Sequence, residues 1–500
     1  MEAKTICTAG EDTICAIATP PGMGGIGIVR VTGDNALQLL QALFHREPAL
    51  SFTEHPRELL YGHIRDPERR EDVDEVLAVY MPGPGTYTGE DVAEIDCHGG
   101  AVPLAEVMTL LMKSGCRHAE PGEFTKRAFL NGRMDLAQAE AVMDLVSAQT
   151  EEAGSVAVSQ LKGRFSAEIQ SLRAGLTDLL VQIEVNIDYP DEDIDILTDT
   201  GSLSAIRALR EEIGKLLESA RKGKILRDGL RLAIVGKPNV GKSSLLNGLL
   251  RQSRAIVTEI AGTTRDTIEE MVNIKGLPVT IVDTAGIRPT EDAIERIGIE
   301  KSKASLASAD MVLLMTDVSL PLTGEDRDLR NHLPKVPCLI AFNKSDKGIH
   351  LSVEEREAFA GELPYVLISL RGSASKDETW TNSESVERIE DLIYRMATGS
   401  GGAQEERKGP STGAPSPVAF PSARFPAASA AIVTNARHEA ALRRADLALA
   451  SALRAASRGE PPEILEIDLR TAYEELGFIT GDSIQDDVLQ EVFSRFCLGK

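Results

Sequence analysis

One short segment, GKPNVGKS at residues 236–243, restricts the possible folds of this chain more than any other segment. The apolar stretch RLAIV precedes it and the amphipathic stretch SSLLNGLL overlaps its end. A strand, a loop with this spacing and a helix together form a phosphate-binding loop. Gly236 and Gly241 let backbone N–H groups converge on phosphate. Lys242 places a cation at the β- and γ-phosphates, and Ser243 offers a hydroxyl to Mg²⁺. The segment predicts a nucleotide-binding domain.

Two further motifs extend this prediction to the metal ion. DTAG at residues 283–286 follows the apolar stretch VTIV. Asp283 can hold Mg²⁺ through water there, and Gly286 can contact the γ-phosphate. GTTRD at residues 262–266 supplies Thr264 as a further Mg²⁺ ligand. The order and spacing of these motifs are those of a Ras-like GTPase.

The motif NKSD at residues 343–346 selects the base. Asp346 can accept hydrogen bonds from N1 and the exocyclic amine of guanine, while Asn343 reads the base and Lys344 stacks along it. Adenine lacks this pair of donors and would leave a buried Asp346 unpaired. We therefore predict binding and hydrolysis of GTP.

Two positions depart from the usual GTPase pattern. Ile287 follows DTAG, where many small GTPases have the glutamine that orients water. An apolar side chain cannot orient water, so another group or an additional charge must drive hydrolysis. The last guanine-contacting loop is Ser369-Leu370-Arg371 where Ser-Ala-Lys is expected, although backbone N–H contacts can survive this change.

Composition limits the remaining possibilities. A chain of 500 residues suggests about three domains. No apolar run approaches the ~20 residues that a membrane helix needs, and the N-terminus does not resemble an export or transit signal. The cysteines form no Cys-x-x-Cys pair, which fits a reducing cytosol. A net charge of −23 repels phosphate backbones, so nucleic acid would bind at a local basic site or through a partner.

The distribution of apolar, Gly/Pro-rich and amphipathic segments along the chain predicts a multidomain protein that combines α/β and all-α parts. Residues 1–133 consist mainly of strands and turns, with a helix at 101–115, and are expected to form an α+β domain. Leu and Ile residues spaced by three or four predict a long amphipathic helix at 166–187. Apolar stretches alternate with helices at 229–397, as in a buried parallel sheet. We expect a helical domain split into 134–228 and 430–500, an inserted GTPase domain at 229–397, and a flexible insertion at 398–429 rich in Gly, Pro, Ser and Ala.

Several longer segments resemble the MnmE (TrmE) family of tRNA modification GTPases. They include ATPPGMGGIGIVR, PGPGTYTGEDVAEIDCHGG, PGEFTKRAFLNGRMDLAQAEAVMDL, DYPDEDID, DTAGIRPTEDAIERIGIE and the C-terminal FCLGK. The resemblance covers almost the whole chain apart from residues 398–429. It implies a cytoplasmic homodimer that forms a heterotetramer with the flavin-dependent protein MnmG (GidA), which carries FAD. Together they modify C5 of the wobble uridine of certain tRNAs with a one-carbon unit from a tetrahydrofolate derivative, giving aminomethyl or carboxymethylaminomethyl uridine.

The resemblance also explains how Ile287 can be tolerated. It implies a K⁺ ion held by Asn239 and by the backbone of Thr258, Ile260 and Thr263, and it implies Glu295 as the acid that positions water. A K⁺ ion near the phosphates stabilises developing charge as an arginine finger would. The catalytic candidates are then Lys242 and Glu295. The full predicted GTP site comprises Asn239, Val240, Gly241, Lys242, Ser243, Ser244, Thr258, Glu259, Ile260, Ala261, Gly262, Thr263, Thr264, Asp283, Thr284, Ala285, Gly286, Asn343, Lys344, Asp346, Ser369, Leu370 and Arg371.

The N-terminal domain resembles folate-binding barrels and is expected to mediate dimerisation. Arg30, Glu90, Arg133 and Lys500 match the family's contacts to a formyl-tetrahydrofolate. The cations can pair with glutamyl carboxylates, and a carboxylate can bind the N–H edge of the pterin. Cys497 in FCLGK is either a thiolate nucleophile or a buried apolar residue.

Two other functions remain open from the sequence. A regulatory or ribosome-assembly G protein without tRNA-modifying activity would share GKPNVGKSSL, and only the N-terminal segments and FCLGK argue against it. A folate-dependent aminomethyltransferase acting on another substrate would leave the GTPase motifs unexplained.

Overall fold

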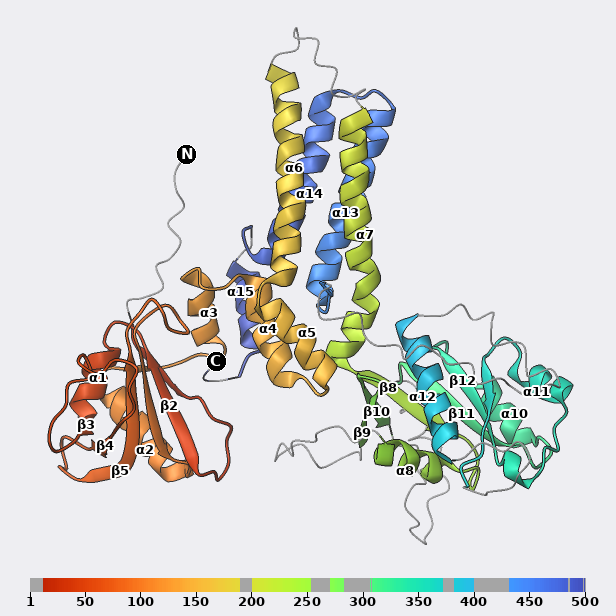
Figure 1. Cartoon of the computed structure of the whole chain (residues 1–500), viewed down its shortest axis with the longest axis horizontal. Helices are drawn as coiled ribbons and strands as arrows, with labels where there is room; N and C mark the ends of the chain where they lie inside the picture. The colour runs from red at the N-terminus through yellow and green to blue at the C-terminus, as the bar shows by residue number, and fades with distance from the viewer. Residues whose placement is uncertain are drawn as a thin grey trace. The chain divides into compact units, whose positions relative to one another are not determined.

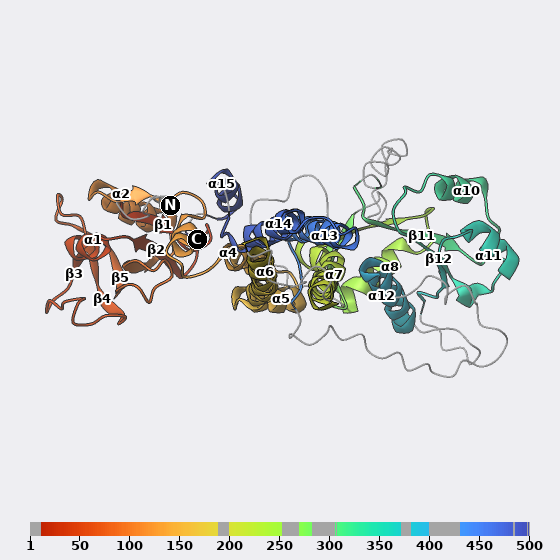
Figure 2. The same cartoon turned by 90° about the horizontal axis from the view of Figure 1, so that it is seen from above.

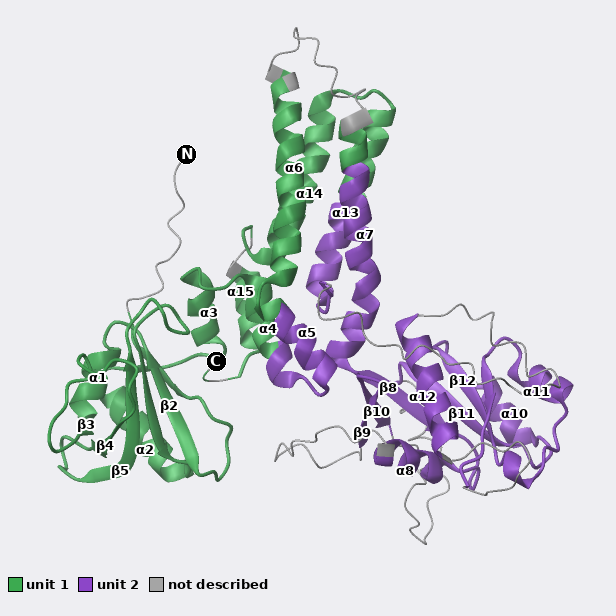
Figure 3. Ribbon diagram, viewed as in Figure 1, with its two compact units in different colours: residues 1–143, 160–205, 447–500 green, residues 144–159, 206–446 purple. Residues whose placement is uncertain are grey.

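The computed structural model describes residues 12–188, 200–252, 270–282, 306, 308–371, 382–399, 431–483, 486–497 and 499. The chain divides into two compact units (Figure 3). The first comprises residues 1–143, 160–205 and 447–500, and the second comprises residues 144–159 and 206–446. The helices that precede and follow the nucleotide-binding motifs are therefore shared between the units.

A seven-stranded sheet forms the N-terminal part of the first unit (Figure 1). Its strands lie in the order β3-β4-β5-β6-β2-β1-β7, and all neighbours are antiparallel except β1 and β7. The bounds are β1 Ile14–Ile17, β2 Ile26–Thr32, β3 Phe44–His45, β4 Leu60–Arg65, β5 Asp72–Met81, β6 Val92–His98 and β7 Arg117–His118.

One face of this sheet forms the hydrophobic core with α1 (Ala36–Leu43) and α2 (Ala101–Lys113). Strand β2 shows why, because Val29 and Val31 alternate with more exposed residues and point into the core. The predicted strand-loop-strand segments and the helix near 101–115 are confirmed. The sequence analysis did not predict two further helices of this region, α1 and α3 (Glu123–Leu130).

Further helices complete the first unit. They are α6 (Arg164–Asp188), α14 (Pro462–Thr480), α15 (Asp486–Ser494) and the beginning of α4 (Leu136–Ser147). Helix α6 packs along α14, as both views show (Figures 1 and 2). Its predicted apolar face is confirmed, since residues spaced by three or four along it are buried: Ile169, Leu172, Leu176, Leu179 and Ile183. An ion pair between Arg470 and Glu184, with an N–O distance of 3.1 Å, joins the two helices at the surface.

Four of the described helices continue from one unit into the other: α4, α5 (Glu151–Leu161), α7 (Thr200–Asp228) and α13 (Ala436–Ser457). Within the second unit, Arg210 of α7 pairs with Asp446 of α13 at 2.8 Å. Further along α7, Ser219 Oγ accepts a hydrogen bond from Val433 N at 3.0 Å. The chain that returns after the nucleotide-binding sheet therefore packs along α7.

The second unit contains a six-stranded sheet in the order β13-β12-β11-β8-β10-β9. All neighbouring strands are parallel except the β9–β10 hairpin. The bounds are β8 Leu230–Val235, β9 Glu270–Ile274, β10 Leu277–Val282, β11 Met311–Asp317, β12 Cys338–Asn343 and β13 Tyr365–Leu367. The prediction of buried apolar strands alternating with helices at 229–397 is thus confirmed by β8, β10, β11, β12 and β13.

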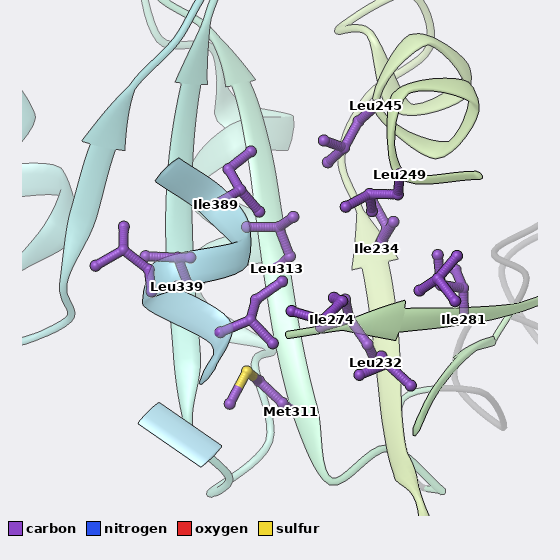
Figure 4. Close-up of a cluster of buried hydrophobic side chains, with 14 of the residues drawn as sticks. Leu232, Ile234, Leu245, Leu249, Ile274, Ile281, Met311, Leu313, Leu339 and Ile389 are labelled. Atoms are coloured by element: carbon purple, nitrogen blue, oxygen red, sulfur yellow. The ribbon is translucent and has the colours of Figure 1, made fainter. Parts of the chain in front are cut away.

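Helices cover both faces of this sheet. Helices α8 (Lys242–Gln252) and α12 (Asn382–Thr398) pack on one face, and α10 (Gly324–Asn331) and α11 (Val353–Ala360) pack on the other (Figure 2). Figure 4 shows Leu249 of α8 beside Ile234 of β8, and Ile389 of α12 beside Leu313 of β11, within one buried apolar cluster. Burial on both faces explains why the central strands are almost continuously apolar.

Candidate functional site

The phosphate-binding loop follows β8 and turns directly into α8. Gly236 has φ +154° and Gly241 has φ +111°, both in the region that favours glycine. A Cβ atom on Gly236 would lie 2.4 Å from Met315 O, and one on Gly241 would lie 2.2 Å from Asn343 Nδ2. The two glycines therefore let the loop lie against the ends of β11 and β12.

Lys242 crosses back over the loop that precedes it. Its Nζ donates to the carbonyl oxygens of Gly236 at 2.7 Å and Lys237 at 2.8 Å. Burial lowers the pKa of Lys242 below its ordinary value. Because Lys242 and Ser243 begin α8, their backbone N–H groups are among those that the helix leaves unpaired. The loop thus presents a cation and helix N-terminal donors, the usual arrangement for binding phosphate.

The crown of the loop is formed by Asn239 and Val240. Asn239 is exposed and has φ +61°, a left-handed conformation that asparagine tolerates better than most residues. Val240 is buried, and its carbonyl oxygen accepts a hydrogen bond from Asn343 Nδ2 at 2.7 Å. Ser244 is exposed on the first turn of α8. The side chain of Asn239 is therefore free of the packing that fixes Val240.

The predicted guanine-binding loops lie together. Asn343 Oδ1 accepts a hydrogen bond from Leu370 N at 3.3 Å. Ser369 Oγ donates to Asp346 Oδ1 at 2.8 Å and approaches Arg371 O at 3.2 Å. The NKSD motif and residues 369–371 are thus joined by hydrogen bonds. Asn343 also donates a hydrogen bond to the phosphate-binding loop.

Lys344 has a partner that the sequence analysis did not name. Its Nζ lies 2.7 Å from Asp317 Oδ2, and Ser319 donates to Asp317 Oδ1 through both its N–H at 3.0 Å and its hydroxyl at 2.6 Å. Burial alone would raise the pKa of Asp317, but the bonds from Lys344 and Ser319 hold it below its ordinary value. A signal was available, since Asp317 ends β11 and polar residues at the carboxyl ends of parallel strands commonly face ligands.

The other predicted residues of the GTPase site lie outside the described residues. These are Thr258, Glu259, Ile260, Ala261, Gly262, Thr263, Thr264, Asp283, Thr284, Ala285, Gly286 and Glu295. Of the predicted Mg²⁺ ligands, the structure describes Ser243, and of the predicted K⁺ ligands it describes Asn239. In the described part of the chain, no group of three His, Cys, Asp or Glu side chains could hold a metal ion.

A second candidate site lies in the N-terminal part of the first unit. A cavity of about 690 Å³ is lined by Asp34, Gly83, Pro84, Gly89, Glu90, Asp91, Asn131 and Arg133. It brings together two of the predicted folate contacts, Glu90 and Arg133. Asp91 is engaged by its neighbours, because its carboxylate accepts from Tyr80 Oη at 2.6 Å and from Gly83 N at 2.9 Å.

Arg30 is not in the lining of this cavity but is connected to it through Tyr87. The guanidinium carbon of Arg30 lies 5.9 Å from the Tyr87 ring centroid, and that of Arg133 lies 5.2 Å from it. Arg133 also donates to the Tyr87 carbonyl oxygen at 3.1 Å. Arg30 pairs with Glu94 at 2.7 Å. Tyr87 therefore links the two predicted cations by cation–π contacts.

The C-terminal motif packs against the N-terminal sheet. Gly499 is buried with φ +84°, and a Cβ atom there would lie 2.5 Å from Ile17 O. The Arg30 guanidinium approaches Gly499 O at 3.4 Å. Cys497 is exposed, so the interpretation of this residue as a buried apolar side chain is wrong. Lys500 lies outside the described residues.

Comparison with known proteins identifies the family. Residues 13–133 match the family described as GTP-binding protein TrmE N-terminus, and residues 136–497 match the one described as MnmE helical domain. A protein of Alkaliphilus metalliredigens named tRNA modification GTPase MnmE is 44% identical over 491 residues, which are 98% of this chain and 99% of the relative. A relative of the same name from Clostridioides difficile is 43% identical over 98% of this chain and 99% of the relative. The chain belongs to the MnmE family of tRNA modification GTPases.

Membership of the MnmE family confirms the family predicted from the sequence motifs. The chain combines a TrmE N-terminal domain, an MnmE helical domain and a P-loop G domain. No helix in the described ranges is long and apolar enough to cross a membrane. Two MnmE-family segments quoted above hold cavity-lining residues that motif reasoning did not select: Asp91 in PGPGTYTGEDVAEIDCHGG and Asn131 in PGEFTKRAFLNGRMDL.

Proposed function

We propose that this protein is a K⁺-dependent GTPase that acts with MnmG to modify C5 of the wobble uridine of certain tRNAs. GTP hydrolysis and a role in tRNA modification follow from membership of the MnmE family. The K⁺ dependence, the folate donor, the partner and the position of the modification extend beyond that membership. The observation that most supports the GTPase part is the direct bonding of the guanine-binding loops to the phosphate-binding loop through Asn343.

This arrangement suggests how the chain selects and holds GTP. Ser369 engages one carboxylate oxygen of Asp346 and orients the carboxylate toward a guanine edge. Lys344 is held by Asp317 so that its apolar stem can lie along the base. Lys242 and the first N–H groups of α8 neutralise the phosphates. Catalytic roles for Lys242 and Glu295 remain part of the proposal.

Among the described residues, Ser243 fits the predicted Mg²⁺ ion and Asn239 fits the predicted K⁺ ion. Ser243 opens α8 with a hydroxyl oxygen, a ligand type that Mg²⁺ prefers. Asn239 presents an exposed side-chain amide from a left-handed backbone at the crown of the loop. Asparagine tolerates the left-handed backbone conformation, so it can offer its side-chain carbonyl oxygen to K⁺ there with little backbone strain. When bound, K⁺ supplies positive charge beside the phosphates in place of the missing glutamine.

The N-terminal cavity fits a tetrahydrofolate derivative such as the 5-formyl or methylene form. Glu90 offers a carboxylate that can accept the N–H edge of a pterin, and Arg133 offers a cation. Arg30, Lys500 and Cys497 are proposed to act at the side of this site where the C-terminal motif packs. The bound derivative supplies the one-carbon unit of the modification.

The assembly is also part of the proposal. We expect a cytoplasmic homodimer that binds MnmG with its FAD as a heterotetramer. The net charge of −23 favours an arrangement in which MnmG holds most of the tRNA backbone.

The K⁺ dependence can be tested by measuring GTP hydrolysis in KCl and NaCl at equal ionic strength. Asn239→Ala removes the amide but also places alanine at φ +61°, which strains the backbone. Asn239→Gly removes the amide without this strain and is the sharper variant. We expect faster hydrolysis in KCl for the unaltered protein and equal rates in both salts for Asn239→Gly. Equal rates in the unaltered protein would refute K⁺ dependence.

The tRNA-modifying role can be tested in a strain that lacks this gene. Mass spectrometry of its tRNA should show loss of the wobble-uridine modification, and the unaltered gene should restore it. An unchanged tRNA would support the alternative, a regulatory or ribosome-assembly G protein.

A further inference from the structure

The cavity residue Glu90 is held from behind by a buried arginine. Arg127 on α3 is 4% exposed, and its Nη1 lies 3.1 Å from Glu90 Oε2. Thr32 Oγ1 lies 3.1 Å from the same oxygen. The other oxygen, Oε1, has only a long approach of 3.5 Å from Asn131 Nδ2. One edge of the carboxylate is thus occupied by the protein, while the other remains available.

Arg127 itself is fixed by several further acceptors. Its Nη1 donates to Asp12 O at 2.9 Å, and its Nη2 donates to Asp12 Oδ1 at 2.7 Å and to Glu123 Oε1 at 3.2 Å. A guanidinium has five N–H donors in a rigid plane, so it can satisfy these acceptors at once. A lysine ammonium is a point charge and cannot reproduce the fork.

A second arginine shares this network without touching Glu90. Arg117 binds Asp12 through its Nε at 2.6 Å and also pairs with Glu123. Its side chain is 44% exposed, compared with 5% for Arg127. Both arginines bind Asp12 and Glu123, but only Arg127 contacts the cavity residue Glu90. Arg117 therefore serves as the control for the effect of that contact.

We propose that Arg127 is a positioning residue that orients Glu90 in the cavity for a ligand edge carrying adjacent N–H donors. This inference rests on the proposed folate site and identifies what holds its carboxylate. A buried guanidinium that keeps one carboxylate oxygen of Glu90 engaged directs the other oxygen toward the ligand. Such preorganisation raises affinity because the ligand need not order the group on binding.

The test uses the full-length protein and 5-formyl-tetrahydrofolate, with binding measured by isothermal titration calorimetry. We expect Arg127→Lys to weaken binding about tenfold or more and Arg117→Lys to change it less than about twofold. Thermal unfolding and the GTPase rate report whether each variant is folded. If Arg127→Lys does not fold, Asp12→Asn loosens Arg127 from a half-exposed position and should weaken binding severalfold.

A double-mutant cycle with Glu90→Gln separates positioning from a structural effect. If Arg127 acts through Glu90, Arg127→Lys should have little further effect on affinity in the Glu90→Gln background. Arg127→Lys binding as tightly as the unaltered protein, or fully additive losses in the cycle, would overturn the inference while leaving the folate site intact. Failure of the unaltered protein to bind would instead refute the proposed folate site, and the inference with it.

Discussion

Two glycines in α7 should respond in opposite directions to the same substitution. Gly223 faces the returning segment 431–435, and a Cβ atom there would lie 2.0 Å from Val433 O and 3.0 Å from Ile432 Cγ2. Gly214 lies nine residues earlier in the same helix, and a Cβ atom there would meet nothing within 4 Å. Replacement of each glycine by alanine therefore isolates the packing of α7 against residues 431–435.

The magnitudes can be estimated from these distances. Alanine in a helix interior is favoured over glycine by roughly 0.5–1 kcal/mol, so Gly214→Ala should stabilise α7 by about that amount. Gly223→Ala gains the same term but forces the Val433 backbone away, and such overpacking costs about 1–3 kcal/mol. The shift also strains the hydrogen bond from Val433 N to Ser219 Oγ, worth about 1 kcal/mol. We expect a net loss of about 1–3 kcal/mol for Gly223→Ala.

Native-state hydrogen exchange is the appropriate assay, because it reports the opening free energy of α7 without assuming that the whole chain unfolds in one step. Amides of α7 should exchange more slowly in Gly214→Ala and faster in Gly223→Ala. Equal protection in the two variants would show that α7 and residues 431–435 are not in the tight contact described here, and the reasoning would be refuted.

Two other predictions concern charged pairs. Asp317→Asn should weaken binding of fluorescent GDP by about 5–20-fold in a titration, because Lys344 loses its ionic partner. The control Ser319→Ala should change the affinity by less than about twofold. Equal affinities for the two variants would contradict a positioning role of Asp317. The hydrogen bond to Asp74 raises the pKa of His98, so its contribution to stability is complete at acidic pH and is lost as pH rises through the raised pKa. An NMR titration should show this raised pKa, and Asp74→Asn should return it toward the ordinary value.

The sequence predicted an element correctly where neighbouring residues along the chain carried a clear apolar pattern. The strands of the six-stranded sheet were predictable because burial on both faces makes them continuously apolar. Helix α6 was predictable because apolar residues spaced by three or four recur from Ile169 to Ile183. Helices α1 and α3 span only eight residues each, too short for a clear period, and α3 contains both Lys126 and the buried Arg127. Tertiary contacts rather than periodicity determine these short helices.

At both candidate sites, the sequence predicted the ligand-binding groups but not the residues that hold them. Motifs supplied the groups that would touch a ligand, such as Lys344 and Glu90, because those groups stand in recognisable runs of sequence. Their partners are 27 and 37 positions away, Asp317 for Lys344 and Arg127 for Glu90, and no local pattern joins each pair. In both cases a largely buried opposite charge holds the functional group in place. Because these partners would not touch the ligand, changing them should alter affinity through orientation, whereas changing the functional groups removes the contact itself.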